Sequence, residues 1–132
     1  MKTSQYIWFN GRLVPWNEAN VHVMTHALHY GSSVFEGVRC YKTPNGPAIF
    51  RLGDHLGRLF DSAKIYRMPL PYSQDELAAA CRASISENGL ESAYLRPIAF
   101  RGNTGLVSAG IDGGGPADGR GLPVPARIGA VL

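Results

Sequence analysis

Two Asn-Gly pairs, each flanked by short runs rich in β-branched and aromatic residues, constrain the fold of this chain more than any other feature. Asn10-Gly11 lies within residues 6–16, and Asn45-Gly46, after Pro44, lies within residues 34–52. An Asn-Gly pair between two such runs is a strong short-range signal for a β-hairpin. Because hairpins join antiparallel strands, the sequence predicts an antiparallel sheet.

The first of two predicted long helices covers residues 54–68. Asp54 is its predicted N-cap, because an aspartate side chain can accept a hydrogen bond from a free amide of the first turn. Pro69 and Pro71 end the segment. Apolar residues recur at helical spacing and predict one buried face, made of Leu56, Leu59, Phe60, Ala63 and Tyr66.

The second predicted helix, residues 73–89, carries signals at both ends. Ser73 is the expected N-cap, and Glu76 three residues later completes a capping box. Gly89 is expected to stop the helix. A strand is predicted over residues 93–100, and a short helical turn closed by Gly31 lies between the two hairpins.

This order of elements predicts an α+β fold, in which one antiparallel sheet carries two main helices on one face. The domain is expected over residues 1–105. Nine of the sixteen glycines lie in the last 32 residues, without the period of a strand or a helix. Residues 106–132 are therefore expected to form a Gly/Pro-rich, irregular tail, with a short strand over residues 126–132 as the alternative.

Composition argues against two classes of partner. The net charge is +3 and the isoelectric point about 9.1, yet the basic residues are scattered, which disfavours a nucleic-acid groove. Apolar runs stay well below the roughly 18 residues of a membrane span. Cys40 and Cys81 lack metal-like spacing and are expected to be reduced, buried thiols of a cytoplasmic protein.

Three histidines and one lysine are candidates for chemistry, but their sequence context favours structural roles. His22, His26 and His29 are close in sequence, but they lack a cysteine or carboxylate at ligand spacing, so no metal site is predicted. Lys64 follows Asp61 by three residues on the first predicted helix. An exposed ion pair between them is expected rather than covalent chemistry at the lysine.

Gly37 interrupts a strand-like run and raises the question of what approaches the backbone there. Phe35, Gly37 and Arg39 alternate onto one face, so the glycine leaves a gap between an aromatic ring and a cation. Arg58 and Arg96 also interrupt apolar patterns, and arginine suits forked binding of carboxylate or phosphate. Ordinary salt bridges at these three arginines are the alternative interpretation.

Four motifs carry a resemblance that spans residues 5–105. They are "YIWFNGRLVPW", "HVMTHALHYGSSVFEGVRCY", "FRLGDHLGRLFDSAKIYRMPL" and "AYLRPIAFRG". Together they resemble the N-terminal small domain of the branched-chain amino acid aminotransferases, which are pyridoxal-phosphate enzymes of fold type IV. The resemblance implies that Arg58 binds the phosphate of the cofactor, and that Phe35, Gly37 and Arg39 wall the substrate pocket.

The same resemblance implies that the site is shared between subunits of a homo-oligomer. Tyr30 matches a tyrosine that reaches into the pocket of the partner subunit. Arg96 matches the arginine that, with this tyrosine, receives the side-chain carboxylate of glutamate. Val107 matches an apolar residue on a loop that crosses to the partner.

The implied reaction transfers an amino group between leucine, isoleucine or valine and 2-oxoglutarate, so the implied partners are these amino acids, glutamate and their 2-oxo acids. In the family, the lysine that bonds to the cofactor belongs to a large domain, and Lys2, Lys42 and Lys64 do not match it. The 132 residues alone are therefore expected to be inactive. A truncation, an altered reading frame and a gene fragment all remain open as origins of the chain.

Two other functions stay open at this point. One is another activity of the same fold, a D-amino acid aminotransferase or an aminodeoxychorismate lyase. The motifs "FEGVRCY" and "AYLRP" argue against this activity. The other is a non-catalytic fragment that acts only by association.

Overall fold

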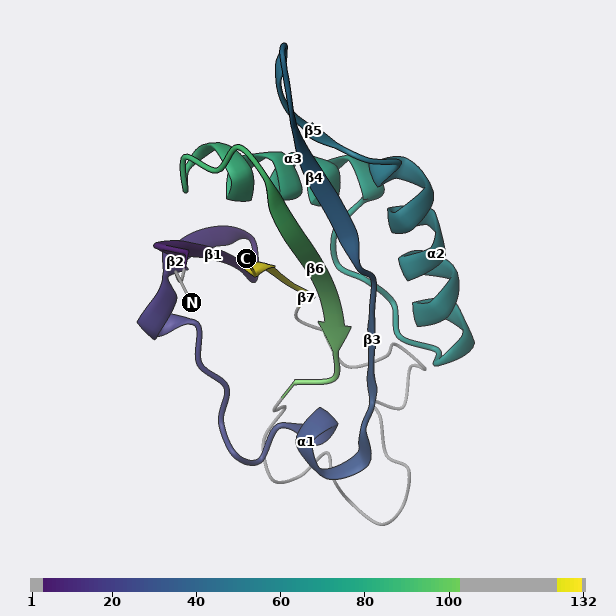
Figure 1. Cartoon of the computed structure of the whole chain (residues 1–132). Coiled ribbons are helices and arrows are strands. Elements are labelled where there is room, and N and C mark those ends of the chain that lie inside the picture. The colour runs from purple at the N-terminus through teal and green to yellow at the C-terminus, as the bar shows by residue number, and fades with distance from the viewer. Residues whose placement is uncertain (1–3, 103–125, 132) are drawn as a thin grey trace.

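The computed structural model of the chain describes residues 4–102 and 126–131. Its elements alternate between hairpins and helices, as Figure 1 shows. In chain order they are β1 (Tyr6–Phe9), β2 (Arg12–Pro15), the 3-10 helix η1 (Trp16–Glu18), α1 (His26–Tyr30), β3 (Ser33–Phe35), β4 (Val38–Thr43), β5 (Gly46–Ile49), α2 (Leu52–Ile65), α3 (Gln74–Ser86), β6 (Ala93–Phe100) and β7 (Ala126–Val131).

Both predicted hairpins are confirmed. β1 pairs with β2 through a two-residue turn in which Asn10 has φ 51° and Gly11 has φ 93°. Two successive positive φ values are typical of the type I′ turn that the Asn-Gly pair predicts. In the second hairpin Thr43 faces Gly46, so Pro44 and Asn45 form the turn. The Thr43 hydroxyl donates to the Gly46 carbonyl at 2.6 Å and holds this turn closed.

The strands form one antiparallel sheet of order β2-β1-β7-β6-β4-β5, with β3 pairing along β6 as well. β6 is central, because β7 lies on one side of it and β3 and β4 lie on the other. The alternative of a strand near the C-terminus is therefore confirmed, and the irregular tail predicted over residues 106–132 is wrong for β7. β7 lies between β1 and β6, and its backbone supplies hydrogen-bonding partners to both strands. The boundary at residue 105 lies outside the described residues.

The run around Gly37 is two strands, not the single strand that the sequence predicts. β3 and β4 follow β6 in one continuous register, but the ladder is interrupted at Glu36 and Gly37. The N–H of Glu36 donates to the carbonyl of Pro97 at 3.0 Å. Pro97 has no N–H to return the bond, so the break arises from the facing proline as much as from the glycine.

Helix α2 begins two residues earlier than predicted, and Asp54 is not its N-cap. The cap position belongs to Arg51, which has a left-handed backbone and makes no side-chain capping bond. Asp54 instead accepts from Nε of Arg51 at 2.7 Å, within the first turn. Tyr66, predicted on the buried face, follows the last helical residue and is exposed.

Helix α3 has the capping box that the sequence predicts. The Ser73 hydroxyl accepts from the amide of Glu76 at 3.2 Å, and the Glu76 carboxylate accepts from the amide of Ser73 at 2.7 Å. After the helix, Gly89 has φ 59°, a conformation that glycine adopts readily, and the N–H of Leu90 returns to the carbonyl of Ile85 at 3.0 Å.

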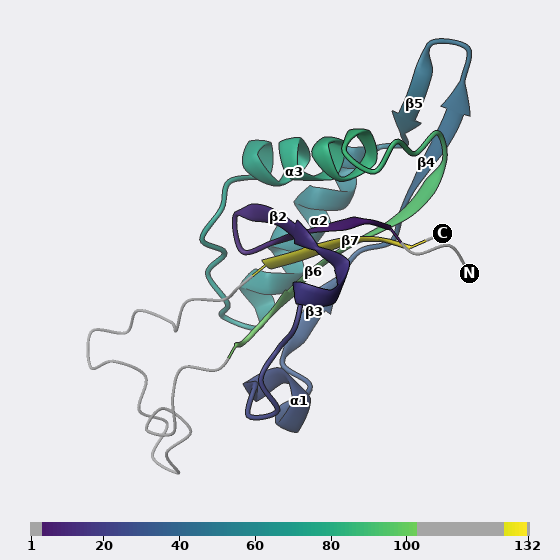
Figure 2. The same ribbon diagram turned by 90° about the vertical axis from the view of Figure 1, so that its left-hand side faces the viewer.

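Helices α2 and α3 cover one face of the sheet, which confirms the predicted two-layer α+β arrangement (Figure 2). Alternate strand residues are buried against them: Val34, Val38, Cys40, Leu95 and Ala99, which pack with Leu56, Leu59, Leu77 and Cys81. Burial in this core raises the pKa of the Cys81 thiol to about 12. The residues between them in sequence, including Phe35, Arg39 and Arg96, are exposed on the other side, which we call the open face.

Two polar contacts fix elements that are distant in sequence. Oδ1 of Asn88, after α3, accepts from the amides of Gln5 (2.7 Å) and Tyr6 (2.9 Å), while its Nδ2 donates to the carbonyls of Tyr6 and Ser84. At the opposite end, the first amides of α1 donate to carbonyls just after β6, where Ala27 bonds to Arg101 at 3.1 Å. Figures 1 and 2 show α1 at the end of the sheet away from the β4–β5 hairpin.

Candidate functional site

The open face gathers several of the side chains that the sequence predicts in a substrate pocket. Adjacent strands β3 and β6 bring the guanidinium carbon of Arg96 to 4.7 Å from the ring centre of Phe35. The same carbon lies 5.5 Å from the ring centre of Tyr94, and Nη2 of Arg96 is 3.5 Å from the Tyr94 hydroxyl. These distances are typical of a cation held by aromatic faces. Because Arg96 is exposed, it is not the costly buried charge that the strand pattern suggests.

The space beside Gly37 is occupied by Tyr94. A Cβ built on Gly37 would fall on the Tyr94 hydroxyl and 2.9 Å from the ring carbon that carries it. Sequence reasoning assigns this gap to a substrate and misses Tyr94. The signal for Tyr94 was available, because it lies two residues before Arg96 on the same strand and therefore shares its face.

Arg39 joins this group from strand β4. Its Cα lies opposite that of Tyr94 in the sheet, and its side chain is exposed. Phe35, Gly37, Arg39 and Arg96 thus lie on one face of adjacent strands, with Tyr94 among them. The arrangement offers an aromatic surface and two cations to a small molecule that carries an apolar part and carboxylates.

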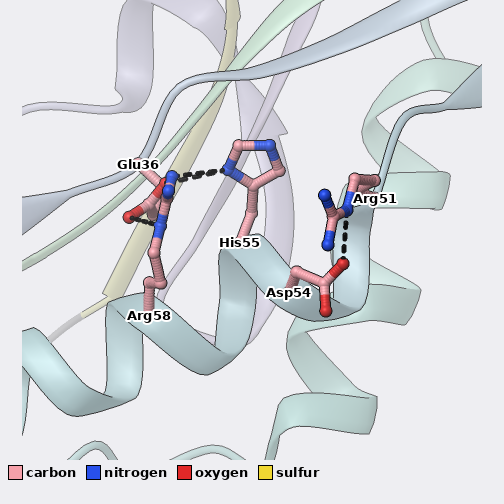
Figure 3. Close-up of polar contacts among 5 residues, drawn as sticks. All are labelled: Glu36, Arg51, Asp54, His55 and Arg58. Atoms are coloured by element: carbon pink, nitrogen blue, oxygen red, sulfur yellow. Dashed lines mark hydrogen bonds and ion pairs between the residues drawn. The ribbon is translucent and has the colours of Figure 1, made fainter.

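Arg58 is positioned on α2, away from that group, and it pairs with Glu36. Nε of Arg58 donates to Oε1 of Glu36 at 3.1 Å, and Nη2 donates to Oε2 at 2.6 Å. Nδ1 of His55, one turn earlier on α2, lies 2.9 Å from the same Oε2. Figure 3 shows Glu36 facing both side chains, while Arg51 and Asp54 form a separate pair. The sequence analysis assigns no role to Glu36 or His55.

The charges in this cluster determine its hydrogen bonds. The hydrogen bonds from Arg58 lower the pKa of Glu36 below its ordinary value, against the effect of burial, and His55 lowers it further. The same contact raises the pKa of Arg58. Because Glu36 is ionised, Nδ1 of His55 must carry the hydrogen and donate. The 3.1 Å approach of Nη2 of Arg58 to this Nδ1 then joins two donors and is not a hydrogen bond.

The remaining predicted residues lie elsewhere or outside the description. Tyr30, on α1, is 69% exposed, and its ring lies 4.5 Å from that of His26. Neither a ring contact nor a hydrogen bond joins it to Arg96 within residues 4–102. Val107 lies outside the described residues.

His26, His29 and Lys42 have ordinary polar partners. His26 bonds to the Ser32 hydroxyl at 2.7 Å and His29 to the Val23 carbonyl at 2.9 Å. In the part of the chain that the structure covers, no three His, Cys, Asp or Glu residues come together as metal ligands. Lys42 pairs with Glu91 at 2.6 Å, whereas the ion pair predicted for Lys64 and Asp61 does not form. None of the described helices is long and apolar enough to span a bilayer.

Comparison with known proteins identifies the family of the chain. The family model for amino-transferase class IV matches residues 33–114. The branched-chain-amino-acid aminotransferase of Escherichia coli strain K12 is 58% identical over 105 residues, which are 80% of this chain and 34% of the relative. The chain therefore spans about a third of the length of this relative.

Solved structures give the same result for the fold. The Escherichia coli branched-chain amino acid aminotransferase superposes with a TM-score of 0.86 at 52% identity, over 97% of this chain and 40% of that one. A branched-chain amino acid aminotransferase from Thermobaculum terrenum, solved in its PLP holo form, gives a TM-score of 0.76 at 30% identity, over 98% and 40%. The chain belongs to the class IV aminotransferases and is homologous to the N-terminal part of the branched-chain enzymes.

Proposed function

We propose that this chain forms the small-domain part of a pyridoxal-phosphate-dependent branched-chain aminotransferase, with Leu, Ile or Val and 2-oxoglutarate as substrates. One observation carries the proposal: Phe35, Gly37, Arg39 and Arg96, separated by up to 61 positions in sequence, share one exposed face of adjacent strands. The identity of 58% to the Escherichia coli enzyme supports the same substrate class. The relatives and solved structures named above are branched-chain enzymes, which favours this activity over the alternatives of the same fold.

The open face suits substrates of two kinds. The ring of Phe35 is 55% exposed and offers an apolar surface to an aliphatic side chain. The guanidinium of Arg96 lies over this ring and is free to bind the side-chain carboxylate of glutamate. The Phe35 ring and the Arg96 guanidinium are adjacent. A small movement of Arg96 is therefore sufficient to present either the ring or the guanidinium to a substrate.

Arg58 is the residue that we assign to the phosphate of the cofactor. Its side chain is 65% exposed although Glu36 holds one of its edges, so the donors of the other edge remain accessible. This donor set fits a phosphate dianion, which accepts forked hydrogen bonds from a guanidinium. Pyridoxal phosphate, when bound, supplies the electron sink of amino-group transfer.

A general base at the substrate α-carbon is the part that these residues do not provide. Lys42 is engaged with Glu91, and Lys64 lies on α2 rather than on the open face. General acid–base transfer typically contributes a factor of about 10²–10⁴ to the rate. We therefore propose that the 132 residues bind ligands but do not transfer amino groups by themselves. Association through the exposed Tyr30 and a cytoplasmic location belong to the same proposal.

A chimera tests this function. The chain's residues 1–102 replace the matching segment of the Escherichia coli enzyme, and glutamate formation from leucine and 2-oxoglutarate is measured. Activity is expected in the chimera and not in the 132-residue chain, and Arg96→Ala is expected to impair the glutamate half-reaction more than the leucine one. A folded chimera without activity, or one in which Arg96→Ala impairs both half-reactions equally, would contradict the assignment.

A further inference from the structure

We propose that Glu36 is a positioning residue for Arg58: it binds the inner edge of the guanidinium and thereby presents the outer edge to the phosphate of a ligand. This inference rests on the proposed function of Arg58. It concerns a different residue, which lies between β3 and β4 and on which the substrate-pocket assignment does not depend.

The hydrogen-bond geometry divides the guanidinium into two edges. An arginine side chain has five N–H donors, arranged so that it can bind two planar partners side by side. Glu36 takes the edge formed by Nε and Nη2, with bonds of 3.1 and 2.6 Å. Within residues 4–102, Nη1 makes no hydrogen bond, and the further contact of Nη2 is its 3.1 Å approach to Nδ1 of His55, which joins two donors. The edge formed by Nη1 and Nη2 retains the forked geometry that phosphate oxygens require.

Glu36 is itself held firmly, as a positioning residue must be. Its backbone N–H bonds to the carbonyl of Pro97 in the central strand, and its side chain is only 10% exposed. His55 donates to the carboxylate from α2, one turn before Arg58. The carboxylate is therefore fixed from the sheet and from the helix, while the guanidinium that it holds is 65% exposed.

The surroundings of Arg58 leave room for a ligand. A groove along the first turns of α2 is lined by Phe50, Gly53, Gly57 and Arg58, among others. A Cβ added at either of these two glycines would meet nothing within 4 Å. The helix surface beside Arg58 is therefore open at these two glycines, while Asp54 and Asp61 also line the groove.

Charge alone predicts the opposite effect of Glu36, and this makes the inference testable. A carboxylate next to an arginine reduces the attraction of the site for an anion. If Glu36 acts only through its charge, removing that charge must strengthen phosphate binding. If it positions Arg58, removing it must weaken binding, because the ligand then has to order a mobile side chain.

The experiment measures binding of pyridoxine 5′-phosphate to the full chain by calorimetry, with pyridoxine as the comparison. This probe has no aldehyde, so it cannot react with Lys2, Lys42 or Lys64. The variants are Glu36→Gln and Glu36→Asp. The matched control is Asp54→Asn, which removes one carboxylate from α2, the helix that carries Arg58, but leaves the Arg58–Glu36 contact intact. Glu36→Gln is expected to weaken binding of pyridoxine 5′-phosphate about tenfold, because Arg58 loses a charged hydrogen-bond partner.

The outcomes separate the positioning role of Glu36 from the phosphate-binding role of Arg58. Weaker binding by Glu36→Gln and by the charge-conserving Glu36→Asp, with equal or tighter binding by Asp54→Asn, supports positioning. Unchanged or tighter binding by Glu36→Gln overturns it and leaves the role of Arg58 intact. If the wild-type chain does not prefer pyridoxine 5′-phosphate over pyridoxine, or if Arg58→Ala keeps that preference, both the phosphate-binding role of Arg58 and the positioning role of Glu36 are overturned. If Glu36→Gln does not fold, Glu36→Asp gives the same decision.

Discussion

The hydroxyl of Tyr94 lies where a side chain at Gly37 would begin. Tyr94 lies on β6, and Gly37 immediately precedes the neighbouring strand β4, so the two residues are diagonal neighbours on the open face. The glycine is thus required by packing and not by backbone conformation, since its φ is not in the left-handed region. Its smallness leaves room for the Tyr94 side chain next to Arg96, which brings Gly37, Tyr94 and Arg96 together.

Gly37→Ala is expected to displace Tyr94 and to lower the free energy of unfolding by about 1 kcal/mol, at the low end of overpacking costs because the open face lets the ring move. Gly57→Ala is the control, because its new Cβ enters open space inside α2. It is expected to stabilise the chain by about 0.5–1 kcal/mol. Urea unfolding of both variants checks the signs, and equal effects would contradict the contact with Tyr94.

Ser73→Ala removes one half of the capping box of α3. The amide of Glu76 loses its acceptor, so the free energy of unfolding should fall by about 1 kcal/mol. Ser86→Ala is the matched control on the same helix, since the Ser86 hydroxyl makes only a 3.3 Å bond to the Ala83 carbonyl near the other end. Thermal melts that show the same shift for both serines would mean that the cap does not stabilise the helix.

Asn88→Ala removes four hydrogen bonds: three join the end of α3 to Gln5 and Tyr6, and one returns to the Ser84 carbonyl within the helix. The loss should be about 2 kcal/mol, less than the sum of four separate bonds because water replaces part of them at this exposed site. Asn88→Asp keeps the acceptor for Gln5 and Tyr6 but sets a carboxylate oxygen against the carbonyls of Tyr6 and Ser84, so a loss at least as large as that of Asn88→Ala is expected. Asn45→Ala, in the β4–β5 turn, controls for a general effect of removing an amide. A melt unchanged in Asn88→Ala would show that the contact adds no stability.

The sequence predicted the local elements well because their signals are local. The turn at Asn10-Gly11, the Ser73–Glu76 capping box and the strand over residues 93–100 each depend on a few adjacent residues. The start of α2 was missed because Arg51 adopts a left-handed conformation that no propensity favours. Strand β7 was given only as an alternative, because its pairing with β1 and β6 depends on partners distant in sequence.

The candidate site was predicted only in part, for the same reason. Phe35, Gly37 and Arg39 could be placed on one face from their alternation, and Arg96 attracted attention as a charge in an apolar strand. The contact of Tyr94 with Gly37 and the pairing of Glu36 with Arg58 depend on the register between strands and on the packing of α2. A single sequence does not specify either of these relations, although it contains all the residues.

The Glu36 contact predicts a specific dependence of stability on pH. Because its pKa is lower in the folded chain than its ordinary value of 4.5, the folded state holds this proton more weakly than the unfolded state. Its contribution is therefore fully present above that ordinary value and is lost as the pH falls through the lower, folded value. Between pH 6 and pH 3, the wild-type chain should lose more free energy of unfolding than Glu36→Gln.

Urea unfolding at several pH values across this range measures the difference. Glu76, whose pKa is also lowered, first of all by the backbone amide of Ser73, acts in the same range and sense. A Glu76→Gln variant therefore measures its share, and the double variant shows whether the two contributions add, as expected for separate sites. Parallel curves for the wild type and Glu36→Gln would show that Arg58 and His55 do not stabilise the ionised carboxylate. Convergence of the two curves at low pH is the expected result, since protonated Glu36 and glutamine are then equally neutral.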